Sequence, residues 1–163
     1  MDYTIRPLSA DDREPVMAIF NHYVEHSFAA YPEHRLDPEA FDMFRNMAGG
    51  NPAASIVDRD GAVVGFGMIR AYNPMPAFAQ TAEATYFIHP DHTGKGIGKM
   101  LLHYLEQGGR EKGIRILLAN ISSLNPGSIA FHRRNGFTEC GRFRDVGMKN
   151  GRCFDVVWMQ KMI

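Results

Sequence analysis

The chain has 163 residues, in which 18 Lys and Arg balance 18 Asp and Glu, so its formal net charge at pH 7 is zero. A balanced chain gives no reason to expect a basic surface for nucleic acid or membrane, and no apolar run approaches the ~20 residues that span a bilayer. Residues 1–6 lack the form of a signal peptide, and Cys140 and Cys153 stand alone. These features favour a soluble, cytoplasmic protein with buried, reduced thiols and a single domain over residues 1–163.

Hydrophobic periodicity and turn residues predict about seven strands and about four helices. The expected strands cover residues 4–6, 55–57, 63–69, 82–88, 114–119, 137–146 and 153–159. The expected helices cover residues 11–25, 38–48, 98–112 and 128–135. In chain order this is one strand, two helices, three strands, a helix, a strand, a helix and two strands. That order predicts an α/β (α+β) fold with a central mixed, mostly antiparallel sheet.

The most informative stretch is residues 93–99, Thr-Gly-Lys-Gly-Ile-Gly-Lys, between the fourth strand and the third helix. Alternate glycines let the main chain approach a ligand with no Cβ in the way. The helix that follows directs unpaired N–H groups and its positive dipole end at the turn, which suits a phosphate or pyrophosphate. A plain glycine-rich loop is the alternative. The spacing excludes a Walker A loop, because Met100 stands where Ser or Thr is required, and a dinucleotide fingerprint, because Lys99 replaces its third glycine.

Three motifs, in order and correctly spaced, resemble the GNAT family of N-acetyltransferases, and within it the group of phosphinothricin and methionine sulfoximine acetyltransferases. The first is the turn at residues 93–98, which is similar to the family's acetyl-CoA signature except that Thr93 replaces Arg or Gln. The second joins residues 125–128 to residues 131–137, and the third runs from residue 147 to residue 160. The resemblance spans nearly the whole chain and implies a GNAT-like sheet of about seven strands flanked by about four helices.

The resemblance also implies that acetyl-CoA is the co-substrate and lies where two neighbouring strands splay apart. Its pantetheine would pair with the main chain of the fourth strand, and its pyrophosphate would lie on the glycine turn. The residues assigned to it are Tyr86, Phe87, Ile88, Thr93, Gly94, Lys95, Gly96, Ile97, Gly98, Lys99, Asn125 and Ser128. Because Thr93 carries no charge, binding at the turn would depend on main-chain amides and on Lys95 or Lys99.

Acetyl transfer to an amine needs a base for the amine, a donor for the oxyanion and a proton for the departing thiolate. Glu83 matches the family's general base, and its alternative is a structural carboxylate with a salt-bridge partner. His132 is the candidate acid, because imidazole titrates near the operating pH; its alternative is a surface histidine packed beside Phe131. A strand bulge would free a main-chain N–H of Phe87 or Ile88 for the oxyanion.

The acceptor pocket is expected between the first helical region and the loop after the third strand. Arg70 would bind an acceptor carboxylate through two hydrogen bonds; its alternative is a surface arginine on an edge strand. The residues assigned to this pocket are Phe28, Tyr31, Arg70, Tyr72, Met75 and Phe78. We predict direct acetyl transfer to the primary amine of an amino acid or an analogue such as phosphinothricin or methionine sulfoximine. A polyamine or protein N-terminal acetyltransferase and a non-catalytic CoA-binding sensor are the alternatives.

Two further expectations concern partners and metals. Phe154, Val156 and Trp158 in the final hairpin, together with the resemblance, imply a homodimer, although the same side chains could be buried within one subunit. His22 and His26 match the inverted zincin pattern His-x-x-Glu-His. No third ligand is identifiable in the sequence, so we expect no metal site.

Overall fold

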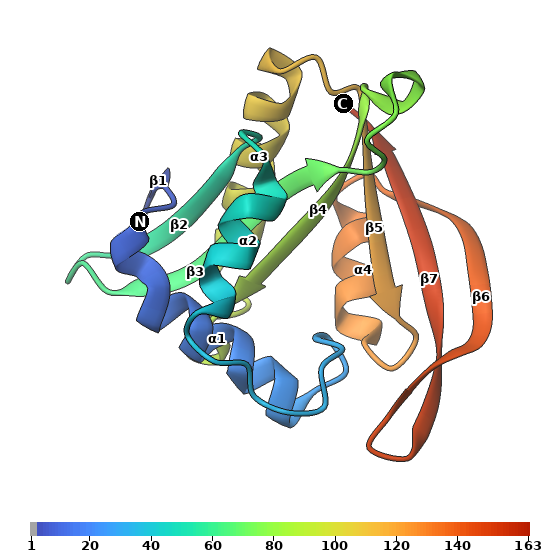
Figure 1. The fold of residues 1–163 in the computed structure, drawn as a ribbon, viewed down its shortest axis with the longest axis horizontal. Coiled ribbons are helices and arrows are strands. Elements are labelled where there is room, and N and C mark those ends of the chain that lie inside the picture. The colour runs from blue at the N-terminus through green and yellow to red at the C-terminus, as the bar shows by residue number, and fades with distance from the viewer. Residues whose placement is uncertain (1–2) are drawn as a thin grey trace.

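The computed structural model describes residues 3–163 and arranges seven strands of this part of the chain in one sheet (Figure 1). The strands are β1 (Tyr3–Pro7), β2 (Ala53–Asp58), β3 (Val63–Ala71), β4 (Thr81–Ile88), β5 (Ile116–Ser122), β6 (Thr138–Lys149) and β7 (Arg152–Met162). Their order across the sheet is β1-β2-β3-β4-β5-β7-β6. Among the described pairs β4–β5 is parallel and the others are antiparallel, which confirms the predicted mixed sheet.

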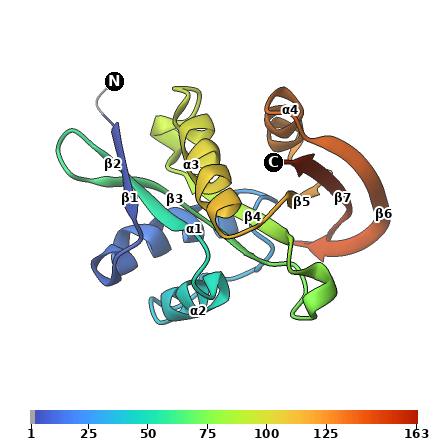
Figure 2. The same ribbon diagram turned by 90° about the horizontal axis from the view of Figure 1, so that it is seen from above.

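In residues 3–163, four α-helices cover the two faces of the sheet (Figure 2). They are α1 (Arg13–His26), α2 (Ala40–Ala48), α3 (Ile97–Glu111) and α4 (Pro126–Arg134). Helices α1 and α2 pack on one face, where Phe41 and Phe66 are buried. Helices α3 and α4 pack on the other face, where Leu101 and Leu105 are buried. None of the described helices combines the length and the apolar character needed to cross a membrane.

Helix ends and turns follow local sequence signals. Gly49 ends α2 in the left-handed conformation (φ 57°). Asn125 begins α4, where its Oδ1 accepts a hydrogen bond from the N–H of Ser128. Asn150 (φ 50°) and Gly151 (φ 73°) form the turn between β6 and β7. The strands on either side of this turn are longer than the sequence predicts, because the pairing of β6 with β7 continues up to it.

Strands β4 and β5 diverge soon after they begin to pair. Their paired residues are Thr81 with Ile116, Ala82 with Leu117 and Glu83 with Leu118, with no later pair in the described chain. Strand β4 then continues beside β3 to Ile88, whereas β5 continues beside β7 to Ser122. Figure 1 shows how this divergence separates the sheet into two parts.

Candidate active site

A cavity of about 900 Å³ lies where β4 and β5 diverge. Its wall contains residues from α1, the loop after α1, α2, β3, β4, the glycine turn, β5 and α4. The predicted acetyl-CoA residues in this wall are Tyr86, Phe87, Ile88, Thr93, Gly94, Gly96, Ile97, Gly98, Lys99, Asn125 and Ser128. Lys95 is exposed and is not part of the wall. The gap in the sheet and the glycine turn therefore belong to one site.

The glycine turn presents a row of unpaired main-chain amides. Gly94 (φ 74°) and Gly96 (φ 81°) are left-handed, and Gly96 is the N-cap of α3. The N–H groups of residues 94–98 have no acceptor within the described part of the chain. Thr93 adds no donor, because its hydroxyl donates back to the preceding main chain at 2.9 Å. Free amides at a helix N-terminus, with Lys99 beside them in the wall, suit a phosphate or pyrophosphate.

The edge of β4 that faces the gap can bind an extended ligand. The N–H of His89 donates to β3, so by alternation the main chain of Tyr86 and Ile88 points the other way, toward the gap. The carbonyl oxygen of Ile88 accepts a hydrogen bond from the hydroxyl of Tyr23 at 2.5 Å. The predicted bulge is wrong, because β3 and β4 pair without a register shift. Phe87 therefore turns its N–H to β3, and the splaying of the strands is what exposes the N–H of Ile88.

His132 is buried, with 4% of its surface exposed, which excludes a surface position for it. Its Nδ1 donates to the carbonyl oxygen of Ser128 at 2.7 Å, since a carbonyl oxygen can only accept. Its Nε2 is then the acceptor for the hydroxyl of Tyr86, at 2.6 Å. Burial lowers the pKa of His132 from its ordinary value and raises the pKa of Tyr86. The imidazole is therefore neutral at pH 7, and its tautomer is set by Ser128.

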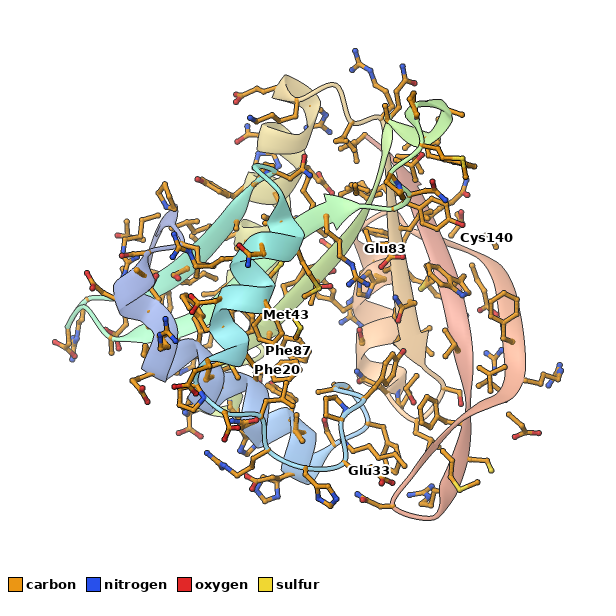
Figure 3. All side chains as sticks on the ribbon, in the orientation of Figure 1. Phe20, Glu33, Met43, Glu83, Phe87 and Cys140 are labelled. Carbon is orange, nitrogen blue, oxygen red and sulfur yellow. The ribbon has the colours of Figure 1, made fainter. Side chains whose placement is uncertain are left out.

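Glu83 and Arg70 form an ion pair near the point where β4 and β5 part, and Figure 3 labels Glu83 there. The two residues face each other on β4 and β3, and Arg70 donates to Oε2 of Glu83 through Nε (3.1 Å) and Nη2 (2.5 Å). Oε1 of Glu83 has no hydrogen-bond partner among residues 3–163. Arg70 is part of the cavity wall. Glu83 is not part of it and is only 8% exposed. The predicted base and the predicted carboxylate anchor therefore meet in a single pair.

Two of the predicted acceptor residues, Tyr31 and Arg70, line the cavity. The hydroxyl of Tyr31 donates to Oδ1 of Asn120 at 3.0 Å. Partial burial, with 41% of the residue still exposed, and the charge of Glu83 together raise the pKa of Tyr31 to about 12. The residues that the wall does not contain are Phe28, Tyr72, Met75 and Phe78.

The loop between β3 and β4 carries three of these four residues away from the cavity. Tyr72 and Phe78 pack edge to face, with ring centres 5.7 Å apart, and Met75 is exposed beside them in the sequence. Phe28 instead packs against Phe154 of the final hairpin, with ring centres 6.1 Å apart. Within one chain, the part of the cavity bordered by Tyr31 and Arg70 is therefore formed without these four side chains.

Wall residues that the sequence does not single out come from helices, strands and the loop after α1. Tyr23 of α1 and Met47 of α2 reach the cavity, and Asn120 faces it from β5. Asn120 does leave a signal in the sequence, because it is the first polar residue of β5. In the structure it lies two positions after Leu118, which pairs with Glu83. Since strand side chains alternate, that spacing puts Asn120 and Glu83 on the same face of the sheet.

Within residues 3–163, no group of three or more His, Cys, Asp or Glu side chains is placed to hold a metal ion. His22 and His26 lie together on α1, with ring centres 4.8 Å apart, but the described chain brings no third ligand to them.

A model of the acetyltransferase (GNAT) family matches residues 16–137, which include β4, the glycine turn, α3 and α4. The chain belongs to this family. It is therefore an N-acetyltransferase that uses acetyl-CoA, as the sequence predicts. The residues present fit this co-substrate, because the unpaired amides of the turn, the free edge of β4 and the start of α4 border one continuous cavity.

Relatives and solved structures resemble this GNAT protein over nearly its whole length. An L-methionine sulfoximine/L-methionine sulfone acetyltransferase of Salmonella typhimurium is 32% identical over 96% of this chain and 92% of its own. A phosphinothricin acetyltransferase from Sinorhizobium meliloti, solved in complex with acetyl-CoA, has a TM-score of 0.93 at 32% identity, covering 100% of this chain and 89% of that one. A ribosomal-protein-alanine N-acetyltransferase from Brucella melitensis has a TM-score of 0.90 at 33% identity, covering 98% and 99%. These neighbours confirm the predicted fold class.

Proposed function

We propose that this GNAT protein transfers the acetyl group of acetyl-CoA directly to the primary amine of an amino acid or a close analogue. The observation that carries the proposal is the pairing of Arg70 with Glu83. This pair lies near the start of β4, and the glycine turn follows the end of the same strand. A guanidinium group binds a carboxylate through two hydrogen bonds, and the α-amine of the same molecule would then lie near a proton acceptor. The acceptors named for two relatives, methionine sulfoximine and phosphinothricin, belong to this chemical class.

In the proposed reaction the amine nitrogen attacks the carbonyl carbon of the thioester. The proton that the amine loses goes to Oε1 of Glu83, directly or through one water, because Oε2 is held by Arg70. The N–H of Ile88, which faces the gap, would donate to the oxyanion. The carbon–sulfur bond then breaks, which leaves the N-acetyl product and the CoA thiolate.

The proton for the thiolate is assigned to His132, acting together with Tyr86. In the structure Nε2 of His132 accepts a hydrogen bond from Tyr86, so His132 must gain a proton before it can give one. Its lowered pKa opposes that step. Water in the open cavity is the alternative source of this proton, so the acid role of His132 stays a prediction.

The preference for a carboxylate tests the role of Arg70. We expect free amino acids, with methionine sulfoximine as the first choice, to be acetylated on the order of 10-fold or more faster than their carboxyl amides, the scale of a lost charged hydrogen bond. Arg70→Ala should erase this difference. The ratio of kcat/KM for the acid and the amide is the measurement.

Arg70→Lys is the matched control, because it keeps a positive charge beside Glu83 but cannot form two parallel hydrogen bonds. We expect it to retain part of the preference for the acid. Equal rates on the acid and the amide in the wild-type enzyme would contradict the carboxylate anchor and favour a polyamine or a peptide as acceptor.

The second candidate function is acetylation of a protein N-terminus, which the name of the Brucella melitensis neighbour favours at 33% identity. The N-terminal residue of a peptide has no free α-carboxylate. Alanine and an alanine-initiated peptide therefore separate the two functions, since an anchor at Arg70 selects the free amino acid. A protein that binds acetyl-CoA but releases no thiol with either acceptor would instead be a sensor.

We also infer that the protein is a homodimer, formed through β6. Phe154, one of the side chains that the sequence indicates for this role, is only 5% exposed and packs within its own chain. Strand β6 is at the edge of the sheet, and its Phe143, Val146 and Met148 are 58%, 59% and 68% exposed. Light scattering at micromolar concentration should give the mass of two chains, and Phe143→Asp should shift it toward one. A wild-type monomer across that range rejects the dimer.

We place the protein in the cytoplasm and treat residues 1–163 as one catalytic domain. The expected burial of the two thiols is wrong, because Cys140 and Cys153 are both exposed, and they are unpaired in the described chain. Exposed thiols of this kind are expected where the compartment is reducing.

A further inference from the structure

Lys149, the last residue of β6, is almost completely buried, with 1% of its surface exposed. Its Nζ donates three hydrogen bonds to main-chain carbonyl oxygens: to Val24 at 2.6 Å, to Ser27 at 2.8 Å and to Ala30 at 2.7 Å. An ammonium group has three N–H donors, so all of them are used. Residues more than a hundred positions apart are thus joined by one side chain.

A lysine at this buried position requires a physical reason. Burial lowers the pKa of Lys149, and an apolar side chain of similar length would be easier to bury. The groups it binds are the last carbonyls of α1 and the loop after it, which a helix leaves without partners and which lie at the negative end of its dipole. Lys149 therefore supplies hydrogen-bond donors and a positive charge to these carbonyl groups, which an apolar side chain cannot do.

The main chain held by Lys149 forms one wall of the acceptor end of the cavity. Residues 29–32 all line the cavity. Within them, Tyr31 stacks on Phe154 of β7, with ring centres 5.5 Å apart. At the adjoining turn the N–H of Asn150 donates to Oε1 of Glu33 at 2.9 Å, and Figure 3 shows Glu33 beside the β6–β7 turn. Three kinds of contact thus hold the loop after α1 against the final hairpin. They are the hydrogen bonds of Lys149, the stacking of Tyr31 on Phe154 and the hydrogen bond from Asn150 to Glu33.

We propose that Lys149 is a positioning residue for the amine acceptor, because it fixes residues 27–32 against the β6–β7 hairpin. This inference rests on the proposed function, which places the acceptor beside Tyr31 and Arg70. The acetyl-CoA end of the cavity is formed by β4, the glycine turn and α4, and Lys149 makes none of its hydrogen bonds to these elements. Affinity for the acceptor therefore depends on Lys149, and affinity for acetyl-CoA does not.

Lys149→Met tests this separation, since methionine keeps the length of the side chain and removes its three donors. With methionine sulfoximine as acceptor, we expect the KM for the acceptor to rise about 10-fold or more, the scale of a charged hydrogen bond, while the KM for acetyl-CoA stays within about twofold. Lys112→Met is the matched control, because Lys112 is an exposed lysine at the end of α3 that does not line the cavity. It should leave both KM values unchanged.

Hydrogen exchange gives a readout that does not depend on turnover. In Lys149→Met the amides of residues 27–31 should exchange about 10-fold faster or more, while those of residues 93–99 keep their wild-type rates; Pro32 has no N–H. A rise of both KM values together, or unchanged exchange in residues 27–31, would overturn the proposal.

Glu33→Ala provides a second variant at the same junction if Lys149→Met does not fold. It removes the acceptor for the N–H of Asn150 at the exposed edge of the junction, and it should raise the acceptor KM and the exchange of residues 27–31 in the same direction. An unchanged acceptor KM together with unchanged exchange in this variant counts against the proposal. If the wild-type protein acetylates no amine, the proposed function fails, whereas the exchange experiment still decides whether Lys149 positions the loop.

Discussion

Replacing Glu83 by glutamine is expected to lower kcat by roughly 10²-fold or more, the scale of general-base catalysis. Glutamine keeps the shape of the side chain and can still accept a hydrogen bond from Arg70, but it cannot take up the proton of the amine. Affinity for acetyl-CoA should be nearly unchanged, because Glu83 is not part of the cavity wall. Thiol release at saturating acetyl-CoA measures the rate, and calorimetry measures the affinity.

Glu106 of α3 provides the matched control for this substitution. It is also a buried carboxylate, 4% exposed, and it is held by Lys161 at 2.5 Å outside the cavity wall. Glu106→Gln therefore weakens a buried ion pair of the same kind at a residue that does not line the cavity, although its charge also acts on Tyr86. An equal rate loss in the two variants, or an unchanged rate and pH profile in Glu83→Gln, would make Glu83 a structural residue.

Gly96→Val is expected to weaken the binding of CoA by about 100-fold or more. A Cβ at this position would enter open space, since nothing lies within 4 Å of it, and that space adjoins the free amides of residues 94–98. A valine there would keep the pyrophosphate from these amides. Losing two hydrogen bonds to a charged group costs about 3–6 kcal/mol, and about 1.4 kcal/mol corresponds to a factor of ten in affinity.

Backbone strain is a separate effect of this substitution, because Gly96 has a φ of 81°, which a β-branched residue strongly disfavours. Gly61, in the turn between β2 and β3, has a φ of 82° and an equally open surrounding. Gly61→Val should therefore lower Tm to a similar extent and leave CoA affinity at the wild-type value. Calorimetry that finds equal affinity loss in both variants, or none in a folded Gly96→Val, would remove the turn from the site.

The parts of the site that depend on neighbouring residues could be predicted from the sequence. Alternate glycines before a helix indicate the anion-binding turn, because left-handed φ angles and a missing Cβ are properties of glycine itself. The cap of Asn125 on the N–H of Ser128 is also local, because a short side chain can reach only a nearby N–H, and it begins α4 at Pro126 instead of the expected residue 128. The Asn150-Gly151 pair indicates the hairpin turn for the same local reason. The splayed strands follow from the family resemblance, and the structure confirms their early divergence.

The contacts that join distant segments were decided only by the tertiary structure. Arg70 meets Glu83 because the register of β3 on β4 places them opposite each other, and a shift of one residue would turn them to opposite faces. Lys149 reaches the end of α1 because the long final hairpin extends to that helix. In the same way, the sequence assigns Tyr72 to the acceptor pocket, but the direction of the loop after β3 places this side chain outside the cavity wall. Residue type determines which turns and caps can form, but strand register, strand divergence and loop direction depend on the packing of the whole chain, and these determine which side chains share the cavity.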